Sequence, residues 1–179
     1  MNKEIYQSIY QHQIRLARQV NQNLSSLINM DHYSLQLNKL NLFQDIQETL
    51  QNIDLSLYTT IPFDTEKYSS YILFHRSFSH ELSLLSLGLQ HEPELKQQTV
   101  KQSLIEEFFC YKISEMIAKY FNSENNQVSV SKEPTSINMD HLSEFSSDLL
   151  VSSISLMNQN TPCGNFYIIF PYSLLWSLA

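Results

Sequence analysis

The chain has 179 residues, enough to bury a hydrophobic core in a single domain. Hydrophobic residues make up 42% of the composition and aromatic residues 12%, which excludes an intrinsically disordered chain. The formal net charge of −7 disfavours binding to nucleic acid or to an anionic membrane surface. No apolar run approaches the roughly 20 residues that span a bilayer, and two cysteines, Cys110 and Cys163, are too few for a disulfide framework. We therefore expect a cytoplasmic protein with reduced thiols and no direct membrane insertion.

The hydrophobic pattern of the first half predicts three helices and three strands. In chain order they are a long amphipathic helix (3–28), a strand (33–37), a short helix capped by Asn41 (42–50), a strand (53–62), a strand (68–74) and a helix that starts at Ser77 or Ser79. Gly88 is placed to end this last helix in a left-handed conformation, which glycine adopts without strain.

The second half repeats this order after a polar joint at residues 90–96. Its predicted elements are a long helix (97–121), a short strand (128–130), a brief helix after Asn138 or Asp140, a strand (149–157), a turn (158–162), a strand (164–170) and a helical turn led by Pro171. The long helix carries a broad apolar face that includes Leu104, Ile105 and Phe108, so we expect it to be more buried than the first helix.

Both halves therefore read as helix, strand, short helix, strand, strand and helix. Connections of hairpin length between the paired strands indicate antiparallel neighbours. One mostly antiparallel sheet, with the long helices on one face and the shorter ones on the other, would bury the apolar residues of both halves. We predict one α/β domain over residues 1–179, a three-layer α/β/α fold in which halves 1–89 and 97–179 are related by an internal pseudo-two-fold axis.

No pattern in the sequence indicates a catalytic, metal or cofactor site. His75 and His80 are the densest polar group, but a spacing of five residues does not place two ligands on one helical face, and no third ligand accompanies them. Cys110 lies among aromatic residues, which favours an inert buried thiol over a nucleophile. The two glycines of the chain cannot form a glycine-rich phosphate loop.

The end of the chain carries the most distinctive combination of residues. A strand led by glycine, 164–170, runs into the sequence Pro-Tyr-Ser-Leu-Leu at 171–175. This resembles the end of the middle domain of the flagellar motor switch protein FliM, where such a strand runs into a Pro-Tyr-Ser-x-Leu turn. Residues 15–18 and 24–27 look like the first helix of that family, and residues 147–151 lie where it has an acidic residue entering a strand. The order and lengths of the elements agree along almost the whole chain.

The resemblance implies a structural, non-enzymatic domain with the same pseudo-symmetric fold. In that family the domain is a wall segment of the cytoplasmic rotor ring, the C-ring. It packs against copies of itself and binds the neighbouring rotor protein FliG through a Gly-Gly-x-Gly loop after the first half. Here the loop corresponds to residues 87–91, and partner binding is expected at Gly88, Leu89, Gln90 and His91. The implied roles are rotor assembly, chemotaxis and motility, with a type III secretion sorting platform as a close variant.

An enzyme is the alternative class. CheC-like phosphatases share the fold and hydrolyse the aspartyl phosphate of a response regulator with an Asp/Ser-x-x-x-Glu-x-x-Asn motif on a helix. The second long helix carries Ser103 and Glu107, but Cys110 where this motif has the Asn that orients the attacking water. The first long helix has Arg18 and Asn21 in the Glu and Asn places, so it lacks the acid. The sequence therefore favours the non-enzymatic reading.

Overall fold

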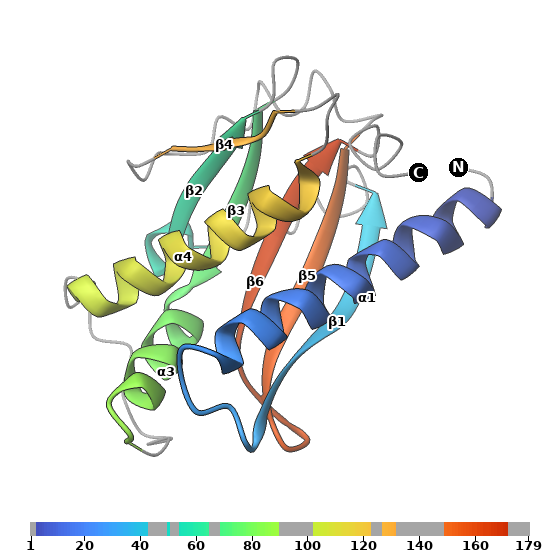
Figure 1. Ribbon diagram of the computed structural model, residues 1–179. Helices are drawn as coiled ribbons and strands as arrows, with labels where there is room; N and C mark the ends of the chain where they lie inside the picture. Colours follow the sequence, from blue (N-terminus) through green and yellow to red (C-terminus); the bar gives the residue numbers. More distant parts are fainter. Residues whose placement is uncertain are drawn as a thin grey trace.

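One antiparallel sheet organises the part of the chain that the structure describes (Figure 1). The structure is a computed structural model that describes residues 3–42, 50, 54–64, 69–89, 102–122, 127–131 and 149–171. In chain order its strands are β1 (Tyr33–Leu42), β2 (Tyr58–Asp64), β3 (Ser69–His75), β4 (Ser129–Val130), β5 (Leu149–Asn158) and β6 (Thr161–Pro171). They lie in the order β1-β5-β6-β3-β2-β4, and each neighbouring pair is antiparallel. The predicted α/β fold class with an antiparallel sheet is confirmed.

The two halves of the chain are interleaved in this sheet. β3 of the first half and β6 of the second pair at its centre, where Ile72 lies opposite Ile168. The outer strands are exchanged, because β1 pairs with β5 of the second half and β4 pairs with β2 of the first. Exchanging β1 with β4, β2 with β5 and β3 with β6 gives the same strand order read from the opposite edge of the sheet. The predicted pseudo-two-fold repeat requires this.

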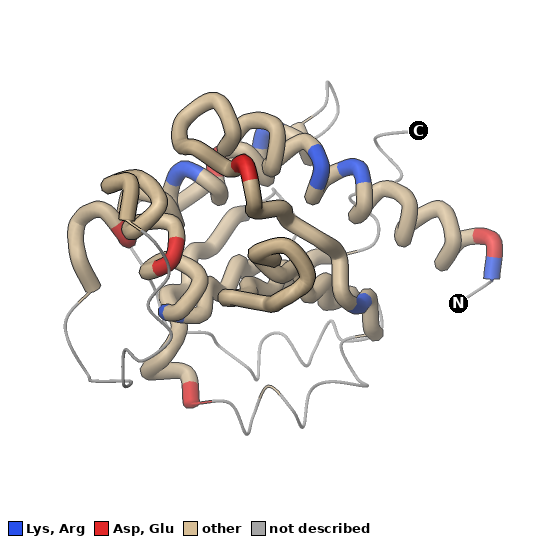
Figure 2. Tube along the Cα trace, turned by 90° about the horizontal axis from the view of Figure 1, so that it is seen from below, with Lys and Arg blue, Asp and Glu red and all other residues tan. Residues whose placement is uncertain are grey.

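Three helices within the described ranges cover one face of the sheet. They are α1 (Lys3–Ser25), α3 (Arg76–Ser86) and α4 (Leu104–Phe121). α1 packs against β1, whereas α4 packs against β2, β4 and α3 (Figure 1). Seen from below, the helices form a layer on one side of the strands (Figure 2). α1 forms because apolar residues recur at helical spacing along it and turn one buried stripe towards the sheet.

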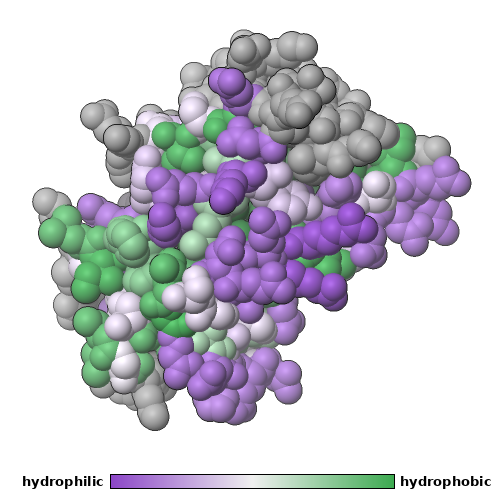
Figure 3. Space-filling model, viewed as in Figure 1, coloured by the Kyte–Doolittle hydropathy of each residue, from purple (hydrophilic) through white to green (hydrophobic). Residues whose placement is uncertain are grey.

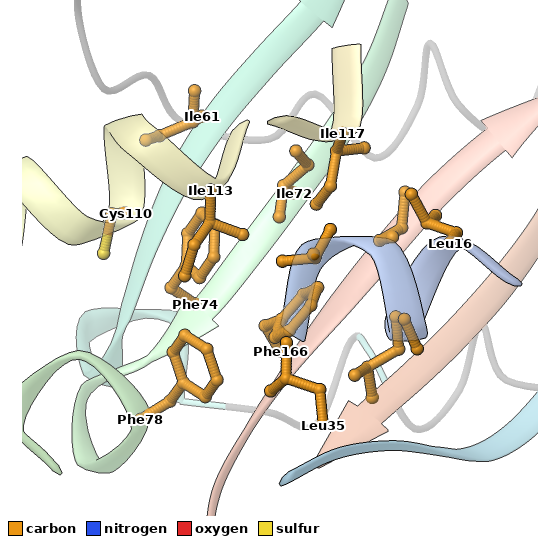
Figure 4. Packing of buried hydrophobic residues seen from close by; sticks show 14 of the residues in the cluster. Leu16, Leu35, Ile61, Ile72, Phe74, Phe78, Cys110, Ile113, Ile117 and Phe166 are labelled. Carbon is orange, nitrogen blue, oxygen red and sulfur yellow. The ribbon is translucent and has the colours of Figure 1, made fainter. Parts of the chain in front are cut away.

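The main core lies between this helical layer and the sheet. The rings of Phe74, Phe78 and Phe166 meet at its centre, with centroid distances of 5.8 Å, 5.4 Å and 5.0 Å for the three pairs (Figure 4). Leu16 from α1 and Ile117 from α4 close over the strands, and neither side chain is exposed. Complete burial of each such side chain contributes roughly 1.5–3 kcal/mol, so this cluster holds the helices on the sheet.

A smaller apolar cluster lies on the other face of the sheet. Its buried strand residues are Tyr71, Leu73, Leu149, Val151 and Ile169. Two residues of the short helix predicted at 42–50 are described: Leu42 belongs to β1, whereas Leu50 is helical and packs against this cluster. A helical residue thus packs on the second face as well, which agrees with the predicted three-layer architecture.

The first strand is longer than predicted. β1 continues through a bulge after Leu37 and ends at Leu42. Asn41 was predicted to cap a helix, but it pairs with Val151 of β5 instead. The prediction was wrong because the long partner strand β5 extends the pairing, and this pairing cannot be seen in the local pattern.

The start of the predicted strand 53–62 is also different. Leu55–Leu57 form a 3-10 turn, and β2 begins only at Tyr58. The turn forms because the Asp54 carboxylate accepts hydrogen bonds from the Ser56 N–H at 3.0 Å and the Ser56 hydroxyl at 2.6 Å. The alternation of leucine and serine in this segment therefore does not mark a strand.

α3 begins earlier than predicted and lies very close to β6. Its N-cap is His75, not Ser77 or Ser79. At Gly164 of β6, an added Cβ atom would stand 2.5 Å from both the Cα and the N atom of Phe78. Gly164 is therefore required by the close approach of two backbones.

β6 is longer than the predicted strand 164–170 at both ends. It begins at Thr161, and Pro171, which was predicted to lead a helical turn, is its last residue and pairs with Leu149. The helical turn predicted after it, and the brief helix predicted after Asn138 or Asp140, lie outside the described residues.

Candidate partner-binding surface

α3 ends in a hydrogen-bonded turn that turns its last residues outward. Gly88 has a φ of +70°, the left-handed conformation predicted for it. The Gly88 N–H donates to the Leu85 carbonyl at 3.1 Å, and the Leu89 N–H donates to the Leu84 carbonyl at 2.9 Å. These two bonds are those of a Schellman motif, which satisfies the last carbonyls of a helix.

Large apolar side chains are exposed at this end of α3 and at the start of α4. They are Leu87, Leu89, Leu104, Ile105 and Phe108, which we call the apolar patch. Leu104 is 83% exposed and Leu87 59% exposed. α3 packs against α4, and Figure 3 shows apolar surface on this side of the molecule. Clustered exposed apolar side chains mark protein-binding surfaces more often than single ones do.

The exposure of three of these residues corrects a prediction. The apolar face predicted for the second long helix included Leu104, Ile105 and Phe108, yet all three side chains are exposed. The reason is that the first turn of α4 extends past the edge of the sheet, where no strand lies beneath it (Figure 1). Later in the helix Phe109 and Ile117 are buried, and α4 buries a larger share of its residues than α1, as predicted.

A buried capping box fixes the start of α4 and joins it to α3. The Ser103 hydroxyl accepts from the Glu106 N–H at 3.2 Å, and the Glu106 carboxylate accepts from the Ser103 N–H at 2.7 Å. The other oxygen of this carboxylate lies 2.9 Å from Nδ1 of His80 on α3. A single glutamate thus sets both the first turn of α4 and its position beside α3.

A second polar link joins the same two elements to the sheet. The Gln102 side chain accepts from the Thr59 hydroxyl of β2 at 2.5 Å and donates to the Ser79 hydroxyl of α3 at 3.4 Å. The contacts of Glu106, His80 and Gln102 form a polar framework that holds the start of α4, and with it part of the apolar patch, against α3 and β2. Sequence reasoning missed this framework, because its residues are far apart in the chain.

The predicted partner-binding residues are only partly described. Gly88 and Leu89 lie at the exposed end of α3, whereas Gln90 and His91 fall outside the described residues. A Cβ atom added at Gly88 would meet nothing within 4 Å. Glycine is thus needed at this position for its backbone conformation, and the space beside it is open.

The three residues of the phosphatase-like pattern on α4 do not form one site. Ser103 is the N-cap, and its hydroxyl is used within the capping box. Glu107 is exposed, whereas Cys110 is fully buried. Burial raises the pKa of the Cys110 thiol to about 12, so the group stays protonated. A carboxamide at Cys110 would also be buried, out of reach of a substrate that approaches Glu107.

On α1 the positions of the Glu and Asn of the phosphatase motif are Arg18 and Asn21, and these two side chains also do not form one site. The Arg18 side chain is exposed. The Asn21 side chain accepts a hydrogen bond from the Leu35 N–H of β1 at 2.8 Å. The Asn21 side-chain oxygen is therefore used in a hydrogen bond to the outer strand β1.

The two neighbouring histidines have separate structural contacts. His75 caps α3, and His80 contacts Glu106. Among the described residues no group of three or more His, Cys, Asp or Glu side chains could hold a metal ion. None of the described helices combines the length and the apolar character needed to cross a membrane.

Comparison with known proteins places the fold. No family model and no curated protein matches the sequence. A chain of the FliG–FliM complex from H. pylori matches with a TM-score of 0.71 and 14% identity, over 96% of this chain and 94% of that one. The FliM middle domain from H. pylori matches with a TM-score of 0.64 and 11% identity, over 99% and 98% of the two chains.

A chain of the CheX–CheY–BeF3–Mg complex from Borrelia burgdorferi is a more distant structural match. Its TM-score is 0.50 at 10% identity, over 88% of this chain and 96% of that one. The chain therefore has the fold of FliM middle domains. The suspected resemblance to the divergent FliM/CheC-like group is confirmed at the level of the fold.

Proposed function

We propose that this chain is a non-enzymatic interaction domain of a flagellar motor switch, acting in rotor assembly, chemotaxis and motility. The observation that carries the proposal is a fold match that extends over almost the whole length of both chains. The described residues offer no assembled catalytic group, because Ser103, Glu107 and Cys110 are turned to different surroundings. The proposed location is the cytoplasm, at the membrane-associated base of the flagellum.

We further propose that the apolar patch and residues 88–91 contact a FliG-like neighbour in the ring. One of the matching structures is a complex of FliG with FliM. The patch provides the exposed apolar area that a protein partner would bury. Its framework of Glu106, His80 and Gln102 holds the patch in a fixed geometry, which lowers the entropy lost on binding.

The first experiment is a pull-down of this domain from native lysate, with bound proteins identified by mass spectrometry. Recovery of flagellar rotor proteins supports the proposal, whereas recovery of secretion-ring proteins would place the domain in a type III secretion sorting platform. Recovery of a response regulator alone would contradict the proposed partner.

Affinity for the recovered rotor protein then tests the patch itself. Leu104→Glu should weaken binding at least about 30-fold, the loss expected at a central interface residue. Leu27→Glu is the matched control, because Leu27 is an exposed leucine in the turn after α1 and is not a member of the patch. Equal affinity of the two variants would remove the patch from the interface.

Ring self-association is a separate proposal. The exposed side of α1 is polar (Figure 3), so contact between copies would use hydrogen bonds and charged groups more than apolar burial. Sedimentation velocity over a range of protein and salt concentrations measures this association. A monomer at every concentration would restrict the role of this domain to binding other proteins.

A phosphatase acting on a response regulator is the second candidate function. The structural match to a chain of the CheX–CheY–BeF3–Mg complex favours it. We expect no acceleration of dephosphorylation by the native chain, and none by Cys110→Asn, because this position is buried. Measurable hydrolysis of an aspartyl phosphate by the unmodified protein would overturn the non-enzymatic proposal.

A further inference from the structure

Histidine is an unusual residue at the start of a helix, because its side chain can carry a positive charge. His75 holds this position in α3 with extended backbone angles, φ −64° and ψ 141°. Asp, Asn, Ser and Thr are the usual residues here, since each has an oxygen that accepts from the first backbone N–H groups. An imidazole can replace them only through an unprotonated ring nitrogen.

The hydrogen bonds of His75 define its protonation state. Nδ1 accepts from the Ser77 N–H at 3.2 Å. The Ser77 hydroxyl lies 2.7 Å from the same nitrogen. Because a backbone N–H can only donate, Nδ1 carries no proton, and the ring is neutral with its hydrogen on Nε2. A second proton would have to bind the nitrogen that caps the helix.

None of the described residues that line the hollow beside the imidazole carries a negative charge. Its ring meets the Tyr58 ring of β2 edge to face at a centroid distance of 4.9 Å. His75 lines this hollow together with Tyr167 and Cys163 of β6. Arg76 follows His75 directly in the chain. The other described residues that line this hollow are uncharged; they are Asn38, Ser77, Ser153, Ser155, Pro162, Gly164 and Asn165. The described titratable groups that line this hollow thus include no carboxylate.

The position at the helix start adds to this disadvantage. The first turn of a helix carries a partial positive charge, which disfavours a nearby cation. Burial lowers the pKa of His75 below its ordinary value of 6.5, in the same direction.

We propose that His75 is a pH-sensitive cap and that proton uptake at its Nδ1 releases the first turn of α3. Protonation turns the acceptor into a donor and breaks the contact with the Ser77 N–H. The released turn leads directly into Phe78, whose backbone lies against Gly164. The inference concerns the folded chain itself and does not depend on its partner.

The sign of the pH effect follows from the preference of the folded state for the neutral ring. The unfolded chain takes up the proton more readily, so the stabilisation by His75 is complete above pH 6.5 and decreases as the pH falls below that value. His80 is the second histidine of this region, and its Nδ1 lies 2.9 Å from the Glu106 carboxylate. The test must therefore separate the two histidines.

Urea unfolding at pH 7.5 and pH 5.5 tests the proposal. His75→Asn keeps a good cap that cannot be charged, and His32→Asn is the matched control at an exposed turn. On going to pH 5.5, the folding equilibrium constant of the native chain and of His32→Asn should fall about fivefold more than that of His75→Asn. An equal pH dependence of native chain and His75→Asn would overturn the proposal.

Nuclear magnetic resonance of the native chain gives a result that needs no variant. The amide resonance of Ser77 should shift with the same midpoint as the His75 imidazole, and this midpoint should lie below 6.5. A Ser77 amide that does not respond while the His75 ring titrates would contradict the proposed release.

Discussion

Gly164 and Gly88 are the two glycines of the chain, and they are required for different reasons. At Gly164 the backbone of α3 occupies the place of a side chain, whereas at Gly88 the space is open and only the left-handed backbone favours glycine. The sequence alone allowed the second role to be predicted, because it follows from the end of a helical pattern. It did not reveal the first, because the contact joins residues far apart in the chain.

Gly164→Ala should be the more costly of the two alanine substitutions. The new methyl group would stand 2.5 Å from backbone atoms of Phe78, so α3 or β6 must move, at a cost of about 1–3 kcal/mol or more. Gly88→Ala should cost roughly 1 kcal/mol, because only the backbone conformation is strained. Urea midpoints of both variants measure the difference, and the reverse order would show that the helix and strand separate easily.

A buried polar pair lies within the apolar core between α1 and β5. The Gln13 side chain accepts from the Ser152 hydroxyl at 2.8 Å, and both residues are fully buried. Among the described residues, Nε2 of Gln13 has no hydrogen-bond partner. An incompletely paired buried amide lowers stability, so this contact contributes less than an apolar pair of the same shape could.

A double-mutant cycle tests this reading of the pair. Ser152→Ala alone leaves the Gln13 oxygen unpaired and should lower the free energy of unfolding by about 1–3 kcal/mol. Gln13→Leu together with Ser152→Ala should recover this loss, because no polar group then remains to be paired. Losses that simply add in the double variant would contradict the explanation.

At the scale of the elements, α1 protects the edge of the sheet. β1 is an outer strand, and such strands expose unpaired backbone groups to other chains. The Leu35 N–H donates to the Asn21 side chain at 2.8 Å, and the Leu40 carbonyl accepts from the Tyr6 hydroxyl at 2.8 Å. The Asn21 acceptor and the Tyr6 donor of α1 thus bind backbone groups on the side of β1 that faces away from β5.

Asn21→Ala should therefore affect both stability and association. It removes a hydrogen bond to a strand N–H, which costs about 1 kcal/mol, and it opens the edge of β1. Gln22→Ala is the control, because Gln22 is an exposed amide next to it on the same helix. Chemical denaturation and light scattering at high concentration measure the two effects, and unchanged values for Asn21→Ala would show that the edge needs no protection.

The elements also show what local patterns can and cannot predict. α1 and β6 could be predicted because their own residues repeat with the period of a helix or a strand. The extension of β1 to Leu42 depends on the length of β5, and the exposure of Leu104 depends on where the sheet ends beneath α4. The α4 residues of the apolar patch follow the spacing of a core-facing helix, so the sequence alone did not predict their exposure.

At the scale of the whole molecule, each half of the chain is incomplete alone. The only described strand partner of β1 is β5. One side of β3 pairs with β2 of the same half, and its other side pairs with β6 of the second half. Residues 1–89 therefore cannot close their core without residues 97–179. A single domain over residues 1–179 stays a prediction, and such a domain would unfold in one cooperative transition.

Fragment complementation tests this interdependence. Fragments 1–96 and 97–179, divided at the end of the polar joint, should each lack a cooperative thermal transition. An equimolar mixture should regain the far-ultraviolet circular dichroism and the transition of the intact chain, because β1 and β4 again find their partners. Independent cooperative folding of either fragment would contradict the single-domain prediction.

The pairing of β1 with β5 also determines when this chain can fold on the ribosome. Tyr33 and Asn158 lie at one end of that pairing, 125 residues apart in the chain. At a synthesis rate of about 5–20 residues per second, β1 must wait roughly 6–25 seconds for its partner. During this interval its apolar side chains remain open to other chains, so the nascent protein would benefit from holding chaperones until β5 has been made.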